Sequence, residues 1–252
     1  MLARQEFGAG DGPPLVIAHG LFGSARNWRA IARALGRHRR VVALDMRNHG
    51  ASFHAPGQSY AEMAGDLARV IAAKGGRADL MGHSMGGKAA MVLALTRPEL
   101  VRRLIVADIA PVAYNHSHID QIEAMRGLDL RGITRRSEAD ARLAAVVPDA
   151  AVRAFLLQSL DLGEGGPRWT LNLDALARAM PELVGWPEIP GRFDGPALFL
   201  RGADSDYVRR EHEAVIRALF PAATIETLPG AGHWLHAEKS REFIAAVERF
   251  LD

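Results

Sequence analysis

The chain of 252 residues contains no cysteine. This absence excludes disulfide bonds, a thiol nucleophile and thiolate metal ligands, and it leaves the redox compartment open. The sequence also has no window approaching the roughly 18 consecutive apolar residues of a membrane span. Residues 1–14 have no apolar stretch long enough for a signal peptide. We therefore expect a cytoplasmic protein without a membrane partner.

Charge of one sign is also scarce, since 31 basic and 29 acidic residues give a formal net charge of only +2. Such a chain creates no strong field that would attract nucleic acid, so we expect no nucleic-acid partner. Hydrophobic residues make up 48% and charged residues 24% of the sequence. These are ordinary values for globular proteins, and they exclude disorder as the main state.

What the sequence does contain is an alternation of short apolar runs with longer helical patterns. The runs are uninterrupted, as in strands buried on both faces of a parallel sheet. They are Leu15–Ala18, Val41–Leu44, Ala78–Met81 and Leu104–Ala107, and the helical patterns between them are Asn27–Leu35, Tyr60–Ala73 and Lys88–Thr96. This alternation predicts a mostly parallel, doubly wound α/β fold.

The alternation stops between residues 114 and 190, where helical patterns continue without a convincing strand. The predicted helices there are Ile119–Met125, Ser137–Val147, Ala150–Leu160 and Leu173–Val184, and the alternation returns with Ala197–Leu200, Arg209–Phe220, Thr224–Leu228 and Ser240–Phe250. We interpret residues 1–113 and 191–252 as one α/β core, and residues 114–190 as an inserted helical cap. The alternative, an independent helical domain, is less favoured because neither junction resembles a flexible linker.

The strongest functional signal is the segment Gly82-His83-Ser84-Met85-Gly86-Gly87. It matches the G-x-S-x-G nucleophile elbow and lies directly between a predicted strand and a predicted helix. Such a tight turn strains the serine backbone, and a side chain at Gly82 or Gly86 would collide with the neighbouring chain. The pattern predicts that Ser84 is a catalytic nucleophile.

A second glycine-rich turn, His19-Gly20-Leu21-Phe22-Gly23, follows the first predicted strand. A serine that attacks a carbonyl needs hydrogen-bond donors for the oxygen that becomes negative. We assign this role to the backbone N–H groups of Leu21 and Met85. An ordinary β–α turn would explain the glycines equally well if the nucleophile turn were absent.

The general base is predicted to be His233, because it lies in a glycine-rich loop after the last predicted strand, which fits the chain order serine, acid, histidine. Eight of the other nine histidines fit other roles. His83 belongs to the elbow, and His19 and His49 lie in turns where an imidazole commonly holds a backbone carbonyl. Surface or cap positions are typical of His38, His116, His118, His212 and His236. No metal-binding His pair is visible, so we expect no metal.

The acid that orients His233 is left open by position alone. Asp108 follows one predicted strand, and Asp204 and Asp206 follow another. Each would also suit the capping of a turn or helix. The carboxyl ends of parallel strands meet at one edge of the sheet, so each of these aspartates could approach the histidine.

Over essentially its whole length, the chain resembles the α/β-hydrolase superfamily. The motifs that carry this resemblance are the His19-Gly20 turn, the segment Asp45–Ser52, the elbow, and the final Gly230-Ala231-Gly232-His233. Within the superfamily the chain is similar to small bacterial esterases of the YbfF type and their mitochondrial relatives. The segments His19–Ser24, Asp108–Val112 and Ala231–Glu238 carry that closer likeness.

The resemblance implies more about the site. The superfamily's usual acid position corresponds to Ser205, a departure from the common pattern, and the YbfF-type pattern moves the acid to Asp108. We therefore favour Asp108, with Asp206 as the alternative. The implied substrates are small short-chain acyl esters or thioesters, cleaved without a cofactor. Candidate pocket residues are Phe22, His83, Trp169 and Trp234, although Trp169 is as well explained by a place in the core.

These residues predict a serine esterase that works through an acyl-enzyme. A dehalogenase or epoxide hydrolase of this fold needs an aspartate at the elbow, and Ser84 argues against both. A carbon–carbon bond hydrolase or a cofactor-free perhydrolase could use the same triad. The non-enzymatic alternative is a receptor of the hydrolase fold that binds a small ligand. Nothing in the sequence indicates an oligomeric state.

Overall fold

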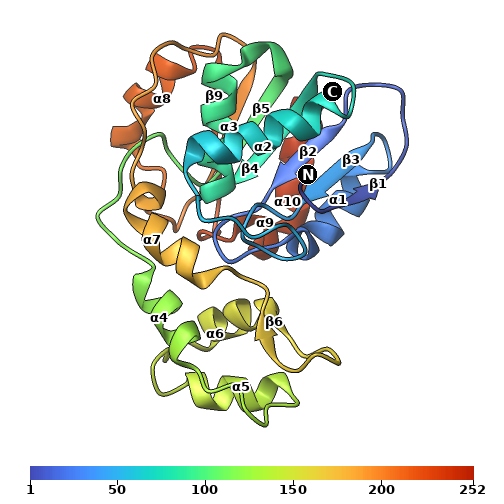
Figure 1. Cartoon of the computed structure of the whole chain (residues 1–252). Helices are drawn as coiled ribbons and strands as arrows, with labels where there is room; N and C mark the ends of the chain where they lie inside the picture. Colours follow the sequence, from blue (N-terminus) through green and yellow to red (C-terminus); the bar gives the residue numbers. More distant parts are fainter.

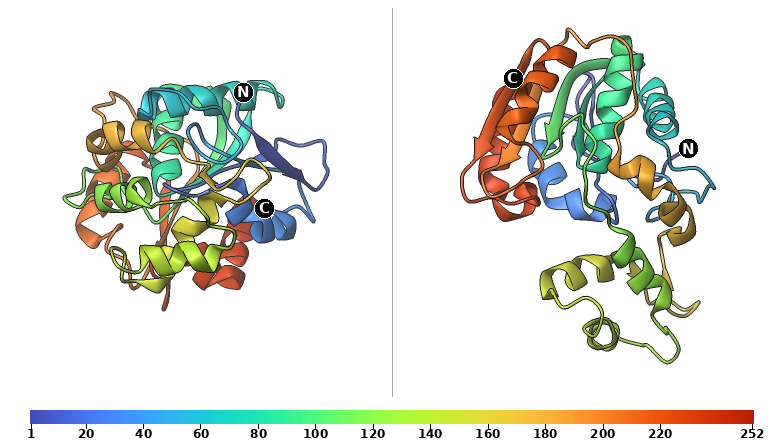
Figure 2. Two further views of the ribbon diagram at one scale, coloured as in Figure 1. Left: turned by 60° about the horizontal axis from the view of Figure 1, so that its bottom comes forward. Right: turned by 90° about the vertical axis from the view of Figure 1, so that its left-hand side faces the viewer.

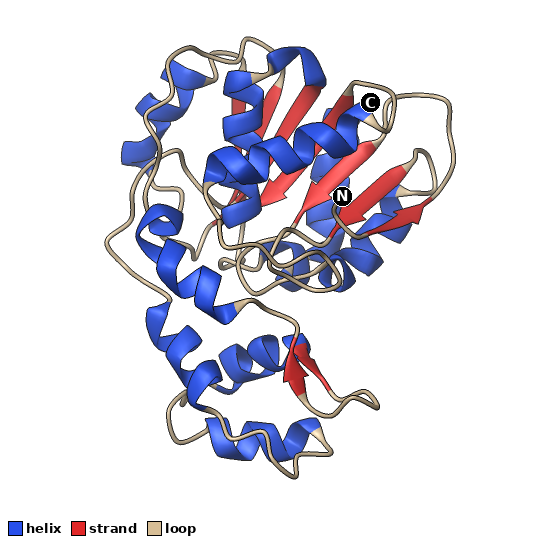
Figure 3. Ribbon diagram, in the orientation of Figure 1, coloured by secondary structure: helices blue, strands red, loops and turns tan.

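The computed structural model describes all 252 residues and contains a seven-stranded sheet in the order β1-β3-β2-β4-β5-β8-β9. Every neighbouring pair is parallel except β1 with β3. The strands of this sheet are β1 (Arg4–Phe7), β2 (Leu15–Ala18), β3 (Val41–Leu44), β4 (Ala78–His83), β5 (Val101–Ala107), β8 (Ala197–Gly202) and β9 (Ala223–Leu228). The predicted doubly wound α/β fold is confirmed (Figure 3).

Helices cover both faces of this sheet (Figure 1). They are α1 (Arg29–Leu35), α2 (Tyr60–Ala72), α3 (Met85–Thr96), α8 (Glu213–Leu219), α9 (Leu235–Glu238) and α10 (Ser240–Leu251), with short 3-10 turns at Ala25–Trp28, Pro98–Leu100 and Arg210–His212. None of the helices has both the length and the apolar character needed to cross a bilayer.

The uninterrupted apolar runs are explained by this double cover. In β2, Val16 and Ala18 pack into the larger buried cluster with residues of α2 and α3. Leu15 and Ile17 point the other way, into a second cluster with α1 and α10. Successive strand residues therefore enter two different cores, and a polar residue would be buried on either face.

The remaining helices lie beyond the carboxyl ends of the strands, at the bottom of the view in Figure 1. In the right view of Figure 2, most of this group lies below the sheet and its helices. Its elements are α4 (Ile119–Gly127), α5 (Arg136–Leu143), α6 (Ala150–Leu156), a 3-10 turn (Leu157–Ser159), β6 (Leu160–Asp161), β7 (Arg168–Trp169) and α7 (Leu173–Val184). The expectation of a strand-free segment was wrong, because β6 and β7 form a small antiparallel pair.

Candidate active site

The turn after β4 places Ser84 between the last strand residue, His83, and the first residue of α3, Met85. Ser84 has φ of 51° and ψ of −120°. A residue other than glycine in such a conformation carries a strain of about 1–3 kcal/mol, which the surrounding packing must offset. The turn exposes the serine hydroxyl at the carboxyl edge of the sheet, where Ser84 contributes to the walls of two cavities.

The two flanking glycines are required by close backbone contacts, as the sequence predicts. A Cβ on Gly82 would lie 2.2 Å from the carbonyl oxygen of Gly86. A Cβ on Gly86 would lie 2.4 Å from the carbonyl oxygen of Ala18 in β2. Since both obstacles are backbone atoms of packed elements, neither can move aside without disturbing the sheet.

A histidine and a buried carboxylate meet at the same edge. The Nδ1 atom of His233, in the loop after β9, lies 2.7 Å from Oδ2 of Asp108. Asp108 is fully buried, directly follows β5 and has a positive φ of 49°. When Nδ1 donates to the carboxylate, the opposite ring atom, Nε2, is left free to accept a proton.

The carboxylate of Asp108 is fully satisfied by its neighbours. Its Oδ1 accepts the backbone N–H of Gly202 at 3.0 Å. Its Oδ2 also accepts the hydroxyl of Ser205, in the loop after β8. The other two candidate acids lie elsewhere. Asp204 is exposed, and the side chain of Asp206 is 90% exposed and lies 3.6 Å from Arg209.

An aromatic ring covers one face of the histidine. Tyr207 stacks on His233 with ring centroids 3.9 Å apart and an angle of 20° between the planes. Its hydroxyl lies 2.8 Å from Nε2 of His116, within hydrogen-bonding distance. Burial raises the pKa of Tyr207 to about 12, so this hydroxyl stays protonated at neutral pH. Tyr207 was not predicted, because no local pattern separates such a tyrosine from any other loop residue.

Two backbone donors near Ser84 lack an acceptor. Met85 begins α3, so its N–H has no partner within the helix, and neither it nor the N–H of Leu21 makes another hydrogen bond in the protein. The hydroxyl of Ser84 also makes no hydrogen bond within the protein. Catalytic hydrogen bonds of this kind often form only in the substrate complex.

Neutral histidines hold the Leu21 turn in place. Nδ1 of His19 donates to the carbonyl of Gly20 at 2.7 Å, and Nε2 accepts the N–H of Met46 at 2.9 Å. His49 holds the carbonyl of Arg47 in the same way, at 2.8 Å. Burial lowers the pKa of His19 to about 4, which keeps the ring uncharged and able to accept. The predicted carbonyl-holding role of both histidines is confirmed.

The larger of the two cavities at Ser84 has a volume of about 140 Å³. Three of the four predicted pocket residues line it, namely Phe22, His83 and Trp234. The fourth does not. Trp169 belongs to β7, where its Nε1 donates to the carbonyl of Met125 at 2.8 Å and its ring packs against the core. Trp169 therefore has the core role that the sequence left open.

Two histidines that the sequence assigned to the surface or the cap also line the larger cavity, His118 and His236. His236 is buried and stacks on Trp28, with centroids 4.3 Å apart and planes within 9° of parallel. The surface assignment of His236 was wrong, because the helix α9 that follows His233 turns this ring inward. Burial lowers its pKa to about 3, so the ring is neutral.

The smaller cavity has a volume of about 30 Å³ and contains a buried lysine. Lys88 is 1% exposed and has no carboxylate partner. Its Nζ donates to the carbonyls of Val184 and Gly185, at 3.1 and 2.5 Å, at the end of α7. Burial lowers its pKa to about 7. The sequence offered one sign of this residue, because Lys88 is the only charged residue in the otherwise apolar α3.

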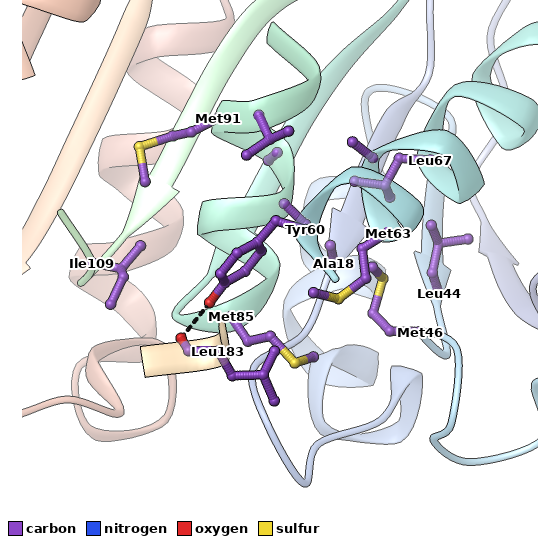
Figure 4. Packing of buried hydrophobic residues seen from close by; sticks show 14 of the residues in the cluster. Ala18, Leu44, Met46, Tyr60, Met63, Leu67, Met85, Met91, Ile109 and Leu183 are labelled. Atoms are coloured by element: carbon purple, nitrogen blue, oxygen red, sulfur yellow. Dashed lines mark hydrogen bonds between the residues drawn. The ribbon is translucent and has the colours of Figure 1, made fainter. Parts of the chain in front are cut away.

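Tyr60 makes a similar connection beside Lys88. Its hydroxyl donates to the carbonyl of Leu183 at 2.6 Å, a bond drawn in Figure 4 among the buried side chains of α2 and α3. Both side chains therefore join core helices to the last turn of α7.

The site has the parts that acyl transfer needs: a hydroxyl on a strained turn, an imidazole backed by a buried carboxylate, and two free N–H groups. Nowhere in the chain do three or more His, Asp or Glu side chains come close enough to hold a metal ion.

Comparison with known proteins adds relatives of described activity. The mouse (Mus musculus) protein named sn-1-specific diacylglycerol lipase ABHD11 is 44% identical over 248 residues, which covers 95% of this chain and 81% of the relative. Esterase YbfF of Escherichia coli (strain K12) is 38% identical over 241 residues, which covers 95% and 93% respectively.

Solved structures agree with this result. A marine microorganism esterase, 38% identical, superposes with a TM-score of 0.94 and covers 99% of this chain and 98% of its own. The family model described as the alpha/beta hydrolase fold matches residues 13–240. The chain belongs to the α/β-hydrolase family, and within this family it is similar to the YbfF-type esterases.

Proposed function

We propose that this protein is a serine carboxylesterase or thioesterase that hydrolyses small, short-chain acyl esters. Ser84 is the nucleophile, His233 the general base, and Asp108 the acid that orients His233. The observation that carries the proposal is the 2.7 Å contact between His233 Nδ1 and buried Asp108, next to a cavity wall shared by His233 and Ser84. The names of the relatives, lipase and esterase, support the same class of reaction.

The reaction proceeds in two steps. In the first, Ser84 Oγ attacks the carbonyl carbon while His233 Nε2 takes the hydroxyl proton. The N–H groups of Leu21 and Met85 bind the oxygen that becomes negative. The intermediate then collapses, the carbon–oxygen or carbon–sulfur bond breaks, and His233 returns the proton to the leaving group. In the second step His233 activates a water molecule, which releases the acid from Ser84.

Residues 114–190 form the cap in this proposal. Side chains from α6, Val152, Phe155 and Leu156, line the larger cavity together with Ser84 and His233. Apolar walls supplied by the cap would exclude bulk water from the acyl-enzyme and limit the size of the substrate.

The decisive experiment combines turnover with covalent labelling. The native chain should hydrolyse p-nitrophenyl acetate and react with a fluorophosphonate probe at Ser84, as located by peptide mass spectrometry. Ser84→Ala should lose both properties and keep the circular dichroism spectrum of the native chain. Ser137→Ala, at an exposed serine of α5, is the matched control and should retain both.

Two outcomes would contradict the proposal. Labelling at another serine, or native activity in Ser84→Ala, would remove the assigned nucleophile. A native chain that binds esters but neither turns them over nor reacts with the probe would be the ligand receptor that the sequence left as an alternative.

A further inference from the structure

Ser84 lies where two cavities of different size and composition meet. Both cavities contain Ser84 and Leu21 in their walls. Only the larger one, of about 140 Å³, also contains His233. Only the smaller one, of about 30 Å³, contains Met85. A substrate attacked at Ser84 therefore has two compartments for its two halves.

The chemistry of the proposed reaction decides which half enters which compartment. The leaving group must face the imidazole, because His233 donates the proton that the departing oxygen or sulfur needs. The acyl chain then points away from the imidazole. We infer that the larger cavity receives the alcohol or thiol part of the substrate, and that the smaller cavity receives the acyl chain. This inference rests on the proposed function and adds an orientation to it.

The size of the smaller cavity then sets the length of the acyl chain. A water molecule needs about 10–15 Å³ of such cavity space, so a cavity of about 30 Å³ has room for a group of about two heavy atoms. An acetyl or propionyl group fits, and a phenylpropanoyl group does not. The larger cavity has room for a bulkier apolar group against Trp28, Phe155 and Trp234.

One wall of the smaller cavity belongs to α7, and the contacts of this helix hold the cavity at its size. Met180 and Leu183 of α7 form that wall, and both are buried. The last turn of α7 is fastened to the core by the hydroxyl of Tyr60 and the ammonium of Lys88, which donate to three carbonyls there. For α7 to move outward, these buried donors would have to lose their acceptors, so a longer acyl chain cannot easily push the wall away.

A pair of reversed esters tests this orientation directly. In 2-phenylethyl acetate the acyl part is small and the alcohol part is large, and in methyl 3-phenylpropanoate the sizes are exchanged. The two compounds are isomers, so they share their atoms and nearly their hydrophobicity. We expect kcat/KM to be at least about tenfold higher for the acetate, since even one misplaced methylene in a pocket changes the rate by about 10–200-fold.

A variant of the wall provides the second measurement. Met180→Ala enlarges the smaller cavity, and it should raise kcat/KM for methyl 3-phenylpropanoate relative to kcat/KM for 2-phenylethyl acetate. Val152→Ala, which enlarges only the larger cavity, is the matched control and should not improve methyl 3-phenylpropanoate.

The possible results separate this inference from the proposed function. A native chain that hydrolyses p-nitrophenyl acetate through Ser84, but prefers methyl 3-phenylpropanoate to its isomer or does not discriminate, would overturn the orientation alone. The orientation would also be overturned if Val152→Ala rather than Met180→Ala admitted the bulky acyl ester. A chain that hydrolyses none of the three esters would overturn the proposed function, and the orientation with it.

Discussion

Replacing Asp108 by asparagine tests the acid assignment, and the structure determines how the new amide must sit. Gly202 N–H donates to Oδ1 of Asp108 at 3.0 Å, so the amide oxygen of the asparagine will take that position. Its NH₂ group then faces Nδ1 of His233 and the hydroxyl of Ser205. In the opposite amide orientation, the NH₂ group would face the Gly202 N–H. Two donors would then meet without an acceptor in a fully buried place.

The fixed amide changes the tautomer of His233. Since an NH₂ group donates to Nδ1, the ring proton moves to Nε2, which can no longer take the proton of Ser84. The same change in a Ser-His-Asp hydrolase lowers kcat by about 10⁴-fold. At about 1.4 kcal/mol per factor of ten, this corresponds to a loss of about 5–6 kcal/mol of transition-state stabilisation.

The assay is kcat/KM for p-nitrophenyl acetate across pH 6–9, with circular dichroism to verify folding. Asp206→Asn is the matched control, and it should stay within about twofold of the native chain because its side chain is exposed and forms an ion pair with Arg209 rather than with His233. A tenth or more of native activity in Asp108→Asn would refute the reasoning. So would a large loss in Asp206→Asn.

Two further predictions concern stability. Lys88 has a pKa of about 7 in the folded chain and about 10.4 when unfolded, so above pH 7 the unfolded state binds more protons and the free energy of unfolding rises with pH. Between pH 7 and 10, the free energy of unfolding measured in urea should rise by up to about 1.4 kcal/mol per pH unit more for the native chain than for Lys88→Met. If the two plots of unfolding free energy against pH are parallel, the prediction is wrong. Gly86→Ala should destabilise the chain by about 1–3 kcal/mol because its Cβ meets the Ala18 carbonyl, whereas Gly12→Ala, with open space around it, should not.

The sheet was predictable where burial on two faces leaves a simple pattern. β2 and β3 coincide with the predicted runs, because all four residues of each strand are buried. β1 was missed since Arg4–Phe7 is an edge strand whose residues alternate between exposed and half-buried. β6 and β7 have two residues each, too few for any periodicity to show.

The residues of the site also differ in whether local sequence or long-range packing determines their place. Ser84 and His233 lie in glycine-rich turns whose conformation is determined by neighbouring residues, so both could be identified from the sequence. Tyr207 and the inward-turned His236 depend on how distant loops pack against each other. Their roles follow from tertiary contacts, which no spacing in the sequence records.

The acid illustrates why a residue's position in a sequence motif predicts its role less well than its position in space. β5 and β8 are parallel neighbours, with Ala107 paired to Leu200, so the residues that follow both strands reach the same edge. A carboxylate after either strand can therefore approach His233. Here the carboxylate follows β5, and Ser205, in the loop after β8, donates to it. The arrangement keeps one negative charge behind the imidazole, and with it the tautomer that the serine requires. That tautomer depends on the carboxylate and not on the strand that supplies it. The same chemistry is therefore possible whether the acid follows β5 or β8.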